Sequence, residues 1–189
     1  MLVLMLTPTM SQAKNNKISC RKNPIYCQIR KNKPSMKWQD AMELSNVIYQ
    51  VSKRHKIPSK IYTAILMQES RYKLNALAKS CGFRELASVN KVKYNFAVSK
   101  KNVGCVYTDF GIAQVHYKSI LRQNLDHKRL LTDLNYSVNA GAEILSYFAR
   151  KFAKKEPHRW FCRYNVGTQS ANKVKIACSG YIKLVKRWM

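Results

Sequence analysis

The stretch that decides the fold is Ile61-Tyr-Thr-Ala-Ile-Leu-Met-Gln-Glu69-Ser70. It is almost entirely apolar before Gln68, which predicts a buried helix that ends close to Glu69. Glu69 follows Ile65 and Ile61 by four and eight positions, so it continues the apolar face of that helix. Partial burial and the negative end of the helix dipole should both raise the pKa of this carboxyl above about 4.3. A raised pKa suits a general acid; the alternative is a solvent-facing side chain at a frayed helix end.

Helical patterns flank this stretch on both sides. Residues 38–55 place apolar side chains at helical spacing, with Asp40 near the start and Arg54 near the end, as the helix dipole prefers. Pro58 breaks that helix, and Ser59 can cap the next one. Further helices are expected at residues 111–125, entered through a turn, at 133–152, and at 170–177 and 180–188.

The segment between Ser70 and Asp109 shows little amphipathic order. Alternation at residues 92–98 allows a short strand or hairpin there. A chain of 189 residues that is 46% hydrophobic is long enough for one well-packed core and short for two. We therefore predict a mainly α, single-domain fold with a small β-hairpin insertion.

The N-terminal segment differs from the rest of the chain. Residues 1–13 contain a brief apolar run and end in Ser11-Gln12-Ala13, a small-x-small pattern of the kind that signal peptidase cuts. We interpret residues 1–13 as a signal peptide; no basic residue precedes the run, so a start further upstream is the alternative. Residues 14–37 are polar and basic, which predicts an irregular arm. No other segment approaches the roughly 18 apolar residues of a membrane span, so we predict a periplasmic or secreted protein that is not integral to the membrane.

The cysteines favour an oxidising compartment. Their even number, beside an export signal, indicates disulfides rather than free core thiols, and nearest-neighbour pairing is the simplest of the pairings that the sequence leaves open. The absence of a Cys-x-x-Cys motif disfavours a zinc site, so we expect neither a metal nor a cofactor. The candidates are Cys20, Cys27, Cys81, Cys105, Cys162 and Cys178.

The charge balance implies anionic partners. The chain has 35 Lys and Arg against nine Asp and Glu, a formal net charge of +26. These charges are spread along the chain, which predicts a basic surface rather than a basic tail. Anionic envelope polymers and nucleic acid are both candidates, but no recognised nucleic-acid-binding motif accompanies the charge.

Three motifs follow one another in the order Gln68-Glu69-Ser70, Gly111-Ile-Ala-Gln-Val115 and Arg163-Tyr-Asn-Val-Gly167. Taken singly, the second and third are ordinary turns. In this order they resemble the signatures of the lytic transglycosylase (SLT-type) domain of the goose-lysozyme-like superfamily. Residues 135–141 and Gly180-Tyr-Ile182 resemble further family features. The resemblance covers residues 38–189, which implies a lysozyme-like transglycosylase domain over that range.

The resemblance assigns roles to several side chains. It implies that Glu69 is the catalytic acid and base, that Gln114 lines a sugar cleft, and that Tyr164 and Asn165 place a hydroxyl and an amide near Glu69. Ser70 and Gly111 belong to the same motifs and are expected at the substrate.

The sequence also departs from the family pattern, and the departures affect the expected shape of the cleft. Ala113 stands where the family has Met, and Arg163 where it has Ala. The connection from Glu69 to Gly111 is longer than usual.

The activity that the resemblance implies is cleavage of peptidoglycan between N-acetylmuramic acid and N-acetylglucosamine with formation of a 1,6-anhydro sugar. Ordinary glycosidases need a second carboxylate, and Asp109, otherwise a turn-capping residue, would fill that role in a hydrolytic lysozyme. The small number of acids instead fits assistance by the N-acetyl group of the substrate. The remaining alternatives are a basic nucleic-acid-binding protein and a non-catalytic envelope scaffold. Small family members serve secretion, pilus or conjugation systems or phages, so such an apparatus is an expected partner.

Overall fold

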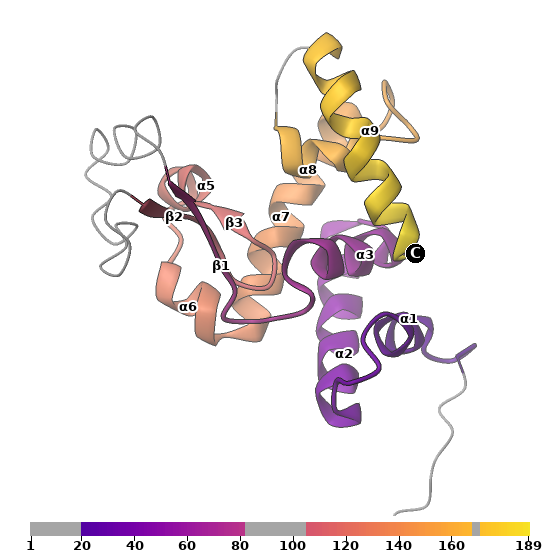
Figure 1. Ribbon diagram of the computed structural model, residues 1–189. Coiled ribbons are helices and arrows are strands. Elements are labelled where there is room, and N and C mark those ends of the chain that lie inside the picture. Colours follow the sequence, from indigo (N-terminus) through magenta and orange to yellow (C-terminus); the bar gives the residue numbers. More distant parts are fainter. Residues whose placement is uncertain (1–19, 82–104, 168–170) are drawn as a thin grey trace, which may run out of the picture.

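The computed structural model describes residues 20–81, 105–167 and 171–189, and for residues 80, 81 and 171–177 it describes the backbone alone. The predicted signal peptide at residues 1–13 and the alternating stretch at residues 92–98 therefore lie outside the described residues. The described part is mainly helical with one small antiparallel sheet, as the sequence predicts. Figure 1 shows the sheet and two short helices on one side of a long central helix and the other helices on the far side.

Three long helices confirm the strongest sequence patterns. They are α2 (Trp38–His55), α3 (Ser59–Ser70) and α7 (Leu134–Phe152). The buried hydroxyl of Tyr62 in α3 donates a hydrogen bond of 2.5 Å to the backbone oxygen of Val138 in α7, which fixes the two helices against each other. The prediction that Ser59 caps α3 is wrong: Pro58 occupies the N-cap position and no side chain caps the helix.

The segment predicted as an irregular N-terminal arm contains a helix, α1 (Pro24–Asn32). Its N-cap Asn23 accepts a hydrogen bond from a backbone N–H, and Pro24 occupies the first turn, where its missing N–H has no consequence. Ile25 and Ile29 bury its apolar face against α2 and α3. The arm is therefore helical at its centre because a good cap and a short apolar stripe coincide.

The C-terminal segment forms one helix, α9 (Ala171–Arg187), where two short helices were predicted. Gly180 sits inside this helix without a break. The buried side chains of Tyr181 and Val185 continue its inner face against the core, and this tertiary packing outweighs the weak helix propensity of glycine. None of the described helices is long and apolar enough to cross a membrane.

The sheet consists of β1 (Leu77–Cys81), β2 (Cys105–Phe110) and β3 (Val115–His116), in the order β1-β2-β3. Asp109 pairs with Ala78 on one side and with His116 on the other, and a bulge interrupts the β1–β2 register beside Ala78. Bulges redirect neighbouring side chains and occur often beside active sites. The sequence predicted a turn and a helix where β3 lies; the helix that follows, α5 (Tyr117–Gln123), is correspondingly shorter.

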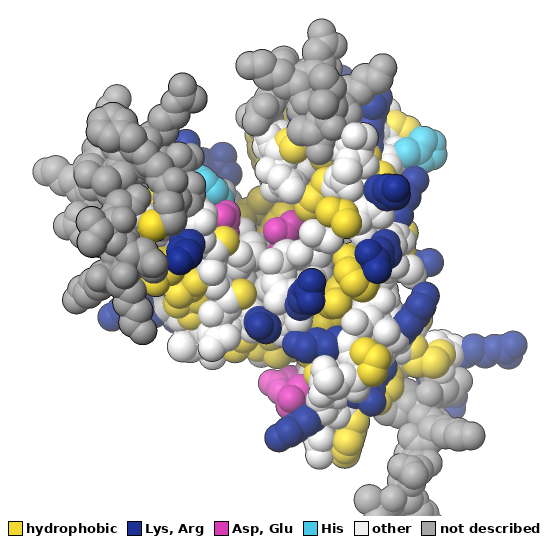
Figure 2. Space-filling model, viewed as in Figure 1, with side chains coloured by type: hydrophobic (Ala, Val, Ile, Leu, Met, Phe, Trp, Pro, Cys, Tyr) yellow, Lys and Arg dark blue, Asp and Glu magenta, His cyan; other side chains and the backbone are white. Residues whose placement is uncertain are grey.

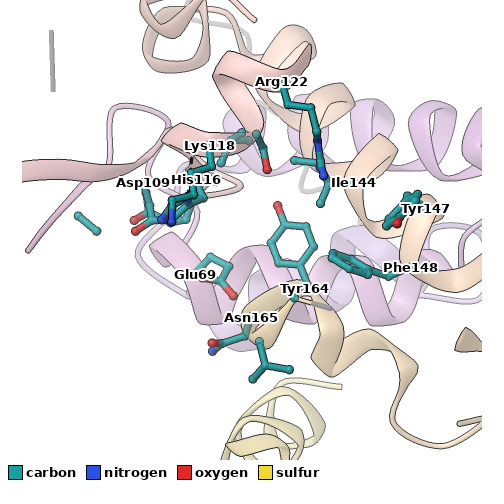
Figure 3. A pocket seen from close by; sticks show the side chains of 16 residues that line it. Glu69, Asp109, His116, Lys118, Arg122, Ile144, Tyr147, Phe148, Tyr164 and Asn165 are labelled. Atoms are coloured by element: carbon teal, nitrogen blue, oxygen red, sulfur yellow. Dashed lines mark hydrogen bonds between the residues drawn. The ribbon is translucent and has the colours of Figure 1, made fainter. Parts of the chain in front are cut away.

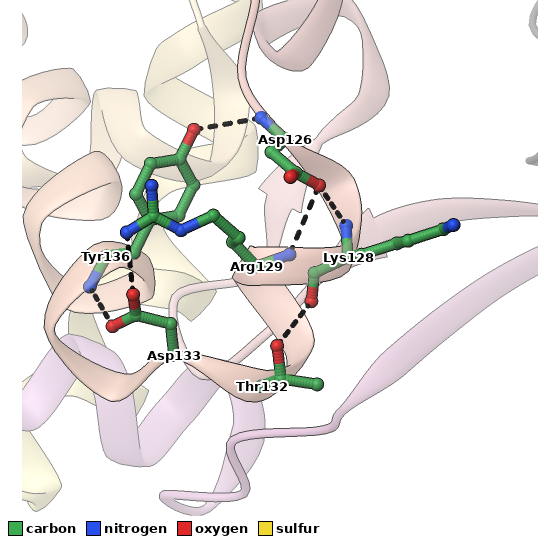
Figure 4. A network of polar contacts seen from close by, with 6 residues as sticks. All are labelled: Asp126, Lys128, Arg129, Thr132, Asp133 and Tyr136. Carbon is green, nitrogen blue, oxygen red and sulfur yellow. Dashed lines mark hydrogen bonds and ion pairs between the residues drawn. The ribbon is translucent and has the colours of Figure 1, made fainter.

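A short helix, α6 (His127–Thr132), lies between α5 and α7 and was not predicted. Asp126 caps α6, and Asp133 caps α7 while pairing with Arg129 at 2.7 Å. The Tyr136 hydroxyl accepts a hydrogen bond from the backbone N–H of Asp126. Figure 4 shows this network, which joins α6 to the start of α7 by local polar contacts, while Leu130 of α6 is fully buried in the core.

Nearest-neighbour pairing of the cysteines is confirmed for two pairs, Cys20–Cys27 and Cys162–Cys178. Cys105 is also disulfide-bonded, and Cys81 lies opposite it in the β1–β2 register. The second disulfide joins the short helix η2 (Trp160–Cys162) to α9, and α8 (Arg163–Val166) follows η2 directly.

Candidate active site

A cleft of about 700 Å³ separates the sheet from the helical part of the molecule. Figure 2 shows acidic side chains inside this hollow, while basic side chains cover much of the surrounding surface. Glu69, Asp109 and Tyr164 line the cleft from α3, β2 and α8 (Figure 3). The two carboxyl groups and residues of all three family-like motifs therefore meet at one place.

Glu69 lies in the last turn of α3, and its side chain is partly buried at the cleft. The Tyr181 hydroxyl donates a hydrogen bond of 2.5 Å to Glu69 Oε1. The pKa of Glu69 is raised to about 7, mainly by burial; the Tyr181 hydrogen bond opposes this rise and the nearby charge of Asp109 adds to it. The predicted rise is confirmed, with burial as its main cause.

Tyr181 is the site residue that the sequence did not assign. It comes from α9 and is almost fully buried, and burial raises the pKa of its hydroxyl, so this group stays a donor at neutral pH. The only sequence signal for Tyr181 was the resemblance of Gly180-Tyr-Ile182 to a family feature, and that resemblance assigned no role to the tyrosine. The structure adds a fixed hydrogen-bond donor to the carboxylate form of Glu69.

Tyr164 was expected to place its hydroxyl near Glu69. It does line the cleft, but the hydroxyl donates a hydrogen bond of 2.6 Å to the backbone oxygen of Ala113, which ties α8 to the turn before β3. Asn165 is exposed and lines the cleft, as expected. The hydroxyl that bonds to Glu69 is therefore that of Tyr181.

Arg163, the departure expected to alter the cleft, points away from it. Its side chain is 3% exposed, pairs with Glu156 and stacks on the ring of Phe152 at 4.1 Å. The other departure, Ala113, is fully buried beside Gly141 of α7, where a larger side chain would meet the helix backbone. Both departures therefore belong to the packing around the site rather than to the cleft surface.

The turn from Gly111 to Gln114 places one side chain at the cleft. The Gln114 amide lines the cleft and donates hydrogen bonds to the backbone oxygens of Gly111 at 2.8 Å and Ala76 at 3.2 Å. Gly111 itself and Ser70 do not line the cleft: Gly111 packs against α6, and the Ser70 hydroxyl bonds to the Leu66 backbone. Gly111 and Ser70 therefore belong to the packing behind the residues that line the cleft.

Asp109 lies in strand β2, so its predicted turn-capping role is wrong. Its carboxylate accepts a hydrogen bond of 2.7 Å from the Thr108 hydroxyl. Burial raises the pKa of Asp109, and the Thr108 hydrogen bond and the charge of His116 oppose that rise. Asp109 thus shares the cleft with Glu69 and acts on its pKa through its charge.

The described residues contain no group of three or more His, Cys, Asp or Glu side chains that could hold a metal ion. The side chains of the cleft offer the chemistry of a carboxyl that is partly protonated at neutral pH and supported by a hydrogen bond. This is the chemistry of proton transfer to and from a bound substrate.

The sequence profile described as "Transglycosylase SLT domain" matches residues 46–179, more than half of the chain. The chain belongs to the SLT transglycosylase family. Members of this family act on peptidoglycan in the cell envelope, and the assignment supports lytic transglycosylase activity, which cleaves glycosidic bonds. No curated protein and no solved structure matches the chain. The matched range contains Glu69 and Tyr164 and ends two positions before Tyr181.

Within this family member, one disulfide connects two segments that build the site. Cys162 directly precedes the segment that carries Tyr164, and Cys178 lies in α9 three positions before Tyr181. The bond therefore fixes the distance between the α8 wall of the cleft and the donor to Glu69.

Removing this disulfide with Cys162→Ala/Cys178→Ala is expected to lower the free energy of unfolding by about 3 kcal/mol, because it closes a loop with a sequence separation of 16. Cys20→Ala/Cys27→Ala, with a separation of 7, is the matched control and should cost about 2 kcal/mol. Urea unfolding measures both losses. Cell-wall cleavage should fall only in the first variant; unchanged cleavage there would show that the disulfide does not hold the cleft.

Proposed function

We propose that the chain is a lytic transglycosylase that cleaves the β-1,4 bond between N-acetylmuramic acid and N-acetylglucosamine, with Glu69 as general acid and then general base. The observation that carries the proposal is the Glu69 carboxyl, whose pKa is about 7, near neutral pH, and whose side chain lines the cleft. A group with a pKa near the ambient pH can donate a proton in one step and accept one in the next.

In the first step, protonated Glu69 donates its proton to the bridging oxygen, and the bond to C1 of the muramoyl sugar breaks with oxocarbenium character. In the second step, the Glu69 carboxylate takes the proton of the C6 hydroxyl, whose oxygen closes on C1 as a 1,6-anhydro bridge. No water is consumed, and Glu69 ends protonated. The Tyr181 hydroxyl stabilises the carboxylate that exists between the two steps.

The walls of the cleft suit a glycan strand. Tyr147, Phe148 and Tyr164 line one side, and aromatic faces pack well on sugar rings (Figure 3). The disulfides support an oxidising location, so we place the protein in the periplasm or outside the cell.

A hydrolytic reaction is the second candidate, and Asp109 is the observation that favours it. Asp109 lines the same cleft and its charge acts on Glu69, so a water molecule held by its carboxylate would attack C1 in place of the C6 hydroxyl. The two reactions differ in product mass by one water.

Mass spectrometry of purified peptidoglycan digested with the wild type and with Asp109→Asn tests both reactions. The proposal expects products one water lighter than hydrolytic muropeptides from both proteins. Reducing-end products from the wild type that disappear in Asp109→Asn would establish a lysozyme. An absence of soluble products from the wild type would overturn both.

Tyr181→Phe is expected to move the pH dependence of cleavage. Loss of a hydrogen bond to a charged group raises the pKa of Glu69, by about one pH unit or more. Because kcat/KM requires protonated Glu69, its decline at high pH should move from near pH 7 to higher pH. Tyr164→Phe is the matched control, since that hydroxyl bonds to Ala113 and should leave the decline in place. If the high-pH decline of kcat/KM keeps its position in Tyr181→Phe, the hydrogen bond from Tyr181 to Glu69 does not set the pKa of Glu69 and the assigned contact is contradicted.

A further inference from the structure

Two basic side chains line the cleft and take no part in the proposed reaction. Lys118 and Arg122 lie four positions apart on α5, so they share one face of that helix, and both are exposed. Figure 3 shows Arg122 reaching from α5 across the cleft toward Ile144 of α7. Among the described residues, neither Lys118 nor Arg122 forms an ion pair.

Lys118 and Arg122 do not tune the pKa of Glu69. The pKa of Glu69 is set by burial, Tyr181 and Asp109, and no cation is among the causes of its shift, although a cation in close contact would lower this pKa. The sugar rings of the glycan, being neutral, need no cations either. The anionic groups of peptidoglycan are the carboxylates of the peptide that is attached to the lactyl group of each muramoyl sugar.

We propose that Lys118 and Arg122 bind carboxylates of this stem peptide, so that the cleft selects peptide-bearing strands over strands stripped of peptide. This inference rests on the proposed function and specifies its substrate. A guanidinium binds a carboxylate through two parallel hydrogen bonds, and an ammonium adds a second contact about one helical turn, roughly 6 Å, away. A ligand that engages both side chains must carry at least two carboxylates, and a stem peptide supplies them.

The test is a binding experiment with the Glu69→Gln variant, in which cleavage of the ligand is expected to be slowed by roughly 10²–10⁴-fold. Its affinity is measured by calorimetry for a muropeptide tetrasaccharide with intact stem peptides and for the same tetrasaccharide after an amidase has removed them. We expect about tenfold tighter binding of the peptide-bearing form, as two partly exposed charged contacts supply. Adding Lys118→Gln/Arg122→Gln should remove that preference and leave binding of the stripped form unchanged.

Lys183→Gln/Lys186→Gln is the matched control. Both side chains are exposed on α9 and outside the cleft lining, and the pair removes the same charge. The control should keep the preference, whereas an equal loss would reduce the effect to general attraction by a basic protein and overturn the inference. Equal affinity for the two tetrasaccharides would also overturn the inference. So would the absence of measurable binding to either of them.

Activity separates this inference from the function on which it rests. Cleavage of both substrates by the otherwise unmodified enzyme at equal rates, with equal binding, would refute stem-peptide recognition and leave the transglycosylase intact. Cleavage of neither substrate, with the binding preference present, would refute the proposed reaction and leave the recognition standing.

Discussion

Glu69→Gln is expected to lower the rate of peptidoglycan cleavage by roughly 10²–10⁴-fold, toward the upper end of that range because the same carboxyl serves both steps. Glutamine keeps the size of the side chain and can still accept the Tyr181 hydrogen bond, so the cleft keeps its shape. The release of soluble muropeptides from purified sacculi measures the loss. Products should lack the anhydro species above background.

The same substitution is expected to stabilise the folded protein at neutral and higher pH. Burial raises the pKa of Glu69 from 4.5 to about 7, so the folded state holds this proton more tightly than the unfolded state. The contribution of this proton to the free energy of unfolding is fully present below pH 4.5 and is lost as the pH rises to about 7. At pH 8 burial of the ionised Glu69 carboxylate costs about 3 kcal/mol of stability. A glutamine at this position avoids that cost because it has no charge.

Glu143→Gln is the matched control, because Glu143 is exposed on α7 and does not line the cleft. It should change neither the cleavage rate nor the pH dependence of unfolding by urea. A Glu69→Gln protein that cleaves at the wild-type rate would remove Glu69 from the mechanism. One that is less stable than the wild type at pH 8 would show that its carboxyl is not destabilised by burial.

The long helices could be predicted because each carries several turns of regular apolar spacing. Patterns at residues 38–55 and 133–152 correspond to α2 (Trp38–His55) and α7 (Leu134–Phe152) within one residue. The short elements β3 and α6 have too few residues for any period to show. Their positions depend on register and on capping by Asp126 and Asp133, which only the folded chain brings together.

The residues of the site also fall into two groups, those that the local sequence predicts and those that only the folded chain brings together. The position and raised pKa of Glu69 followed from its own helix, because burial of a face is a local property of the sequence. Its partner Tyr181 lies 112 positions away, and only the packing of α9 on α3 places its hydroxyl there. Arg163 shows the converse: its position in a family motif suggested the cleft, but Glu156 seven positions earlier draws it into a buried ion pair.

Gly111→Ala is expected to destabilise the protein by roughly 2–5 kcal/mol and to reduce cleavage with it. Gly111 has a φ of 78°, which costs strain in any residue with a Cβ. An added Cβ would lie 2.2 Å from the backbone oxygen of Leu130 in α6 and 2.4 Å from the Ser137 hydroxyl, and the backbone contact cannot give way as a side chain could. The turn would have to shift, and Gln114 with it.

Gly180→Ala distinguishes this mechanism from a general effect of replacing glycine. Gly180 lies inside α9, and no described atom comes within 4 Å of an added Cβ there, so helix propensity alone should stabilise the protein by up to about 1 kcal/mol. Urea unfolding should therefore shift in opposite directions for the two substitutions. A Gly111→Ala protein as stable as the wild type would mean that the turn before β3 can move away from α6 at no cost, and Gln114 would then not be held at the cleft by its backbone.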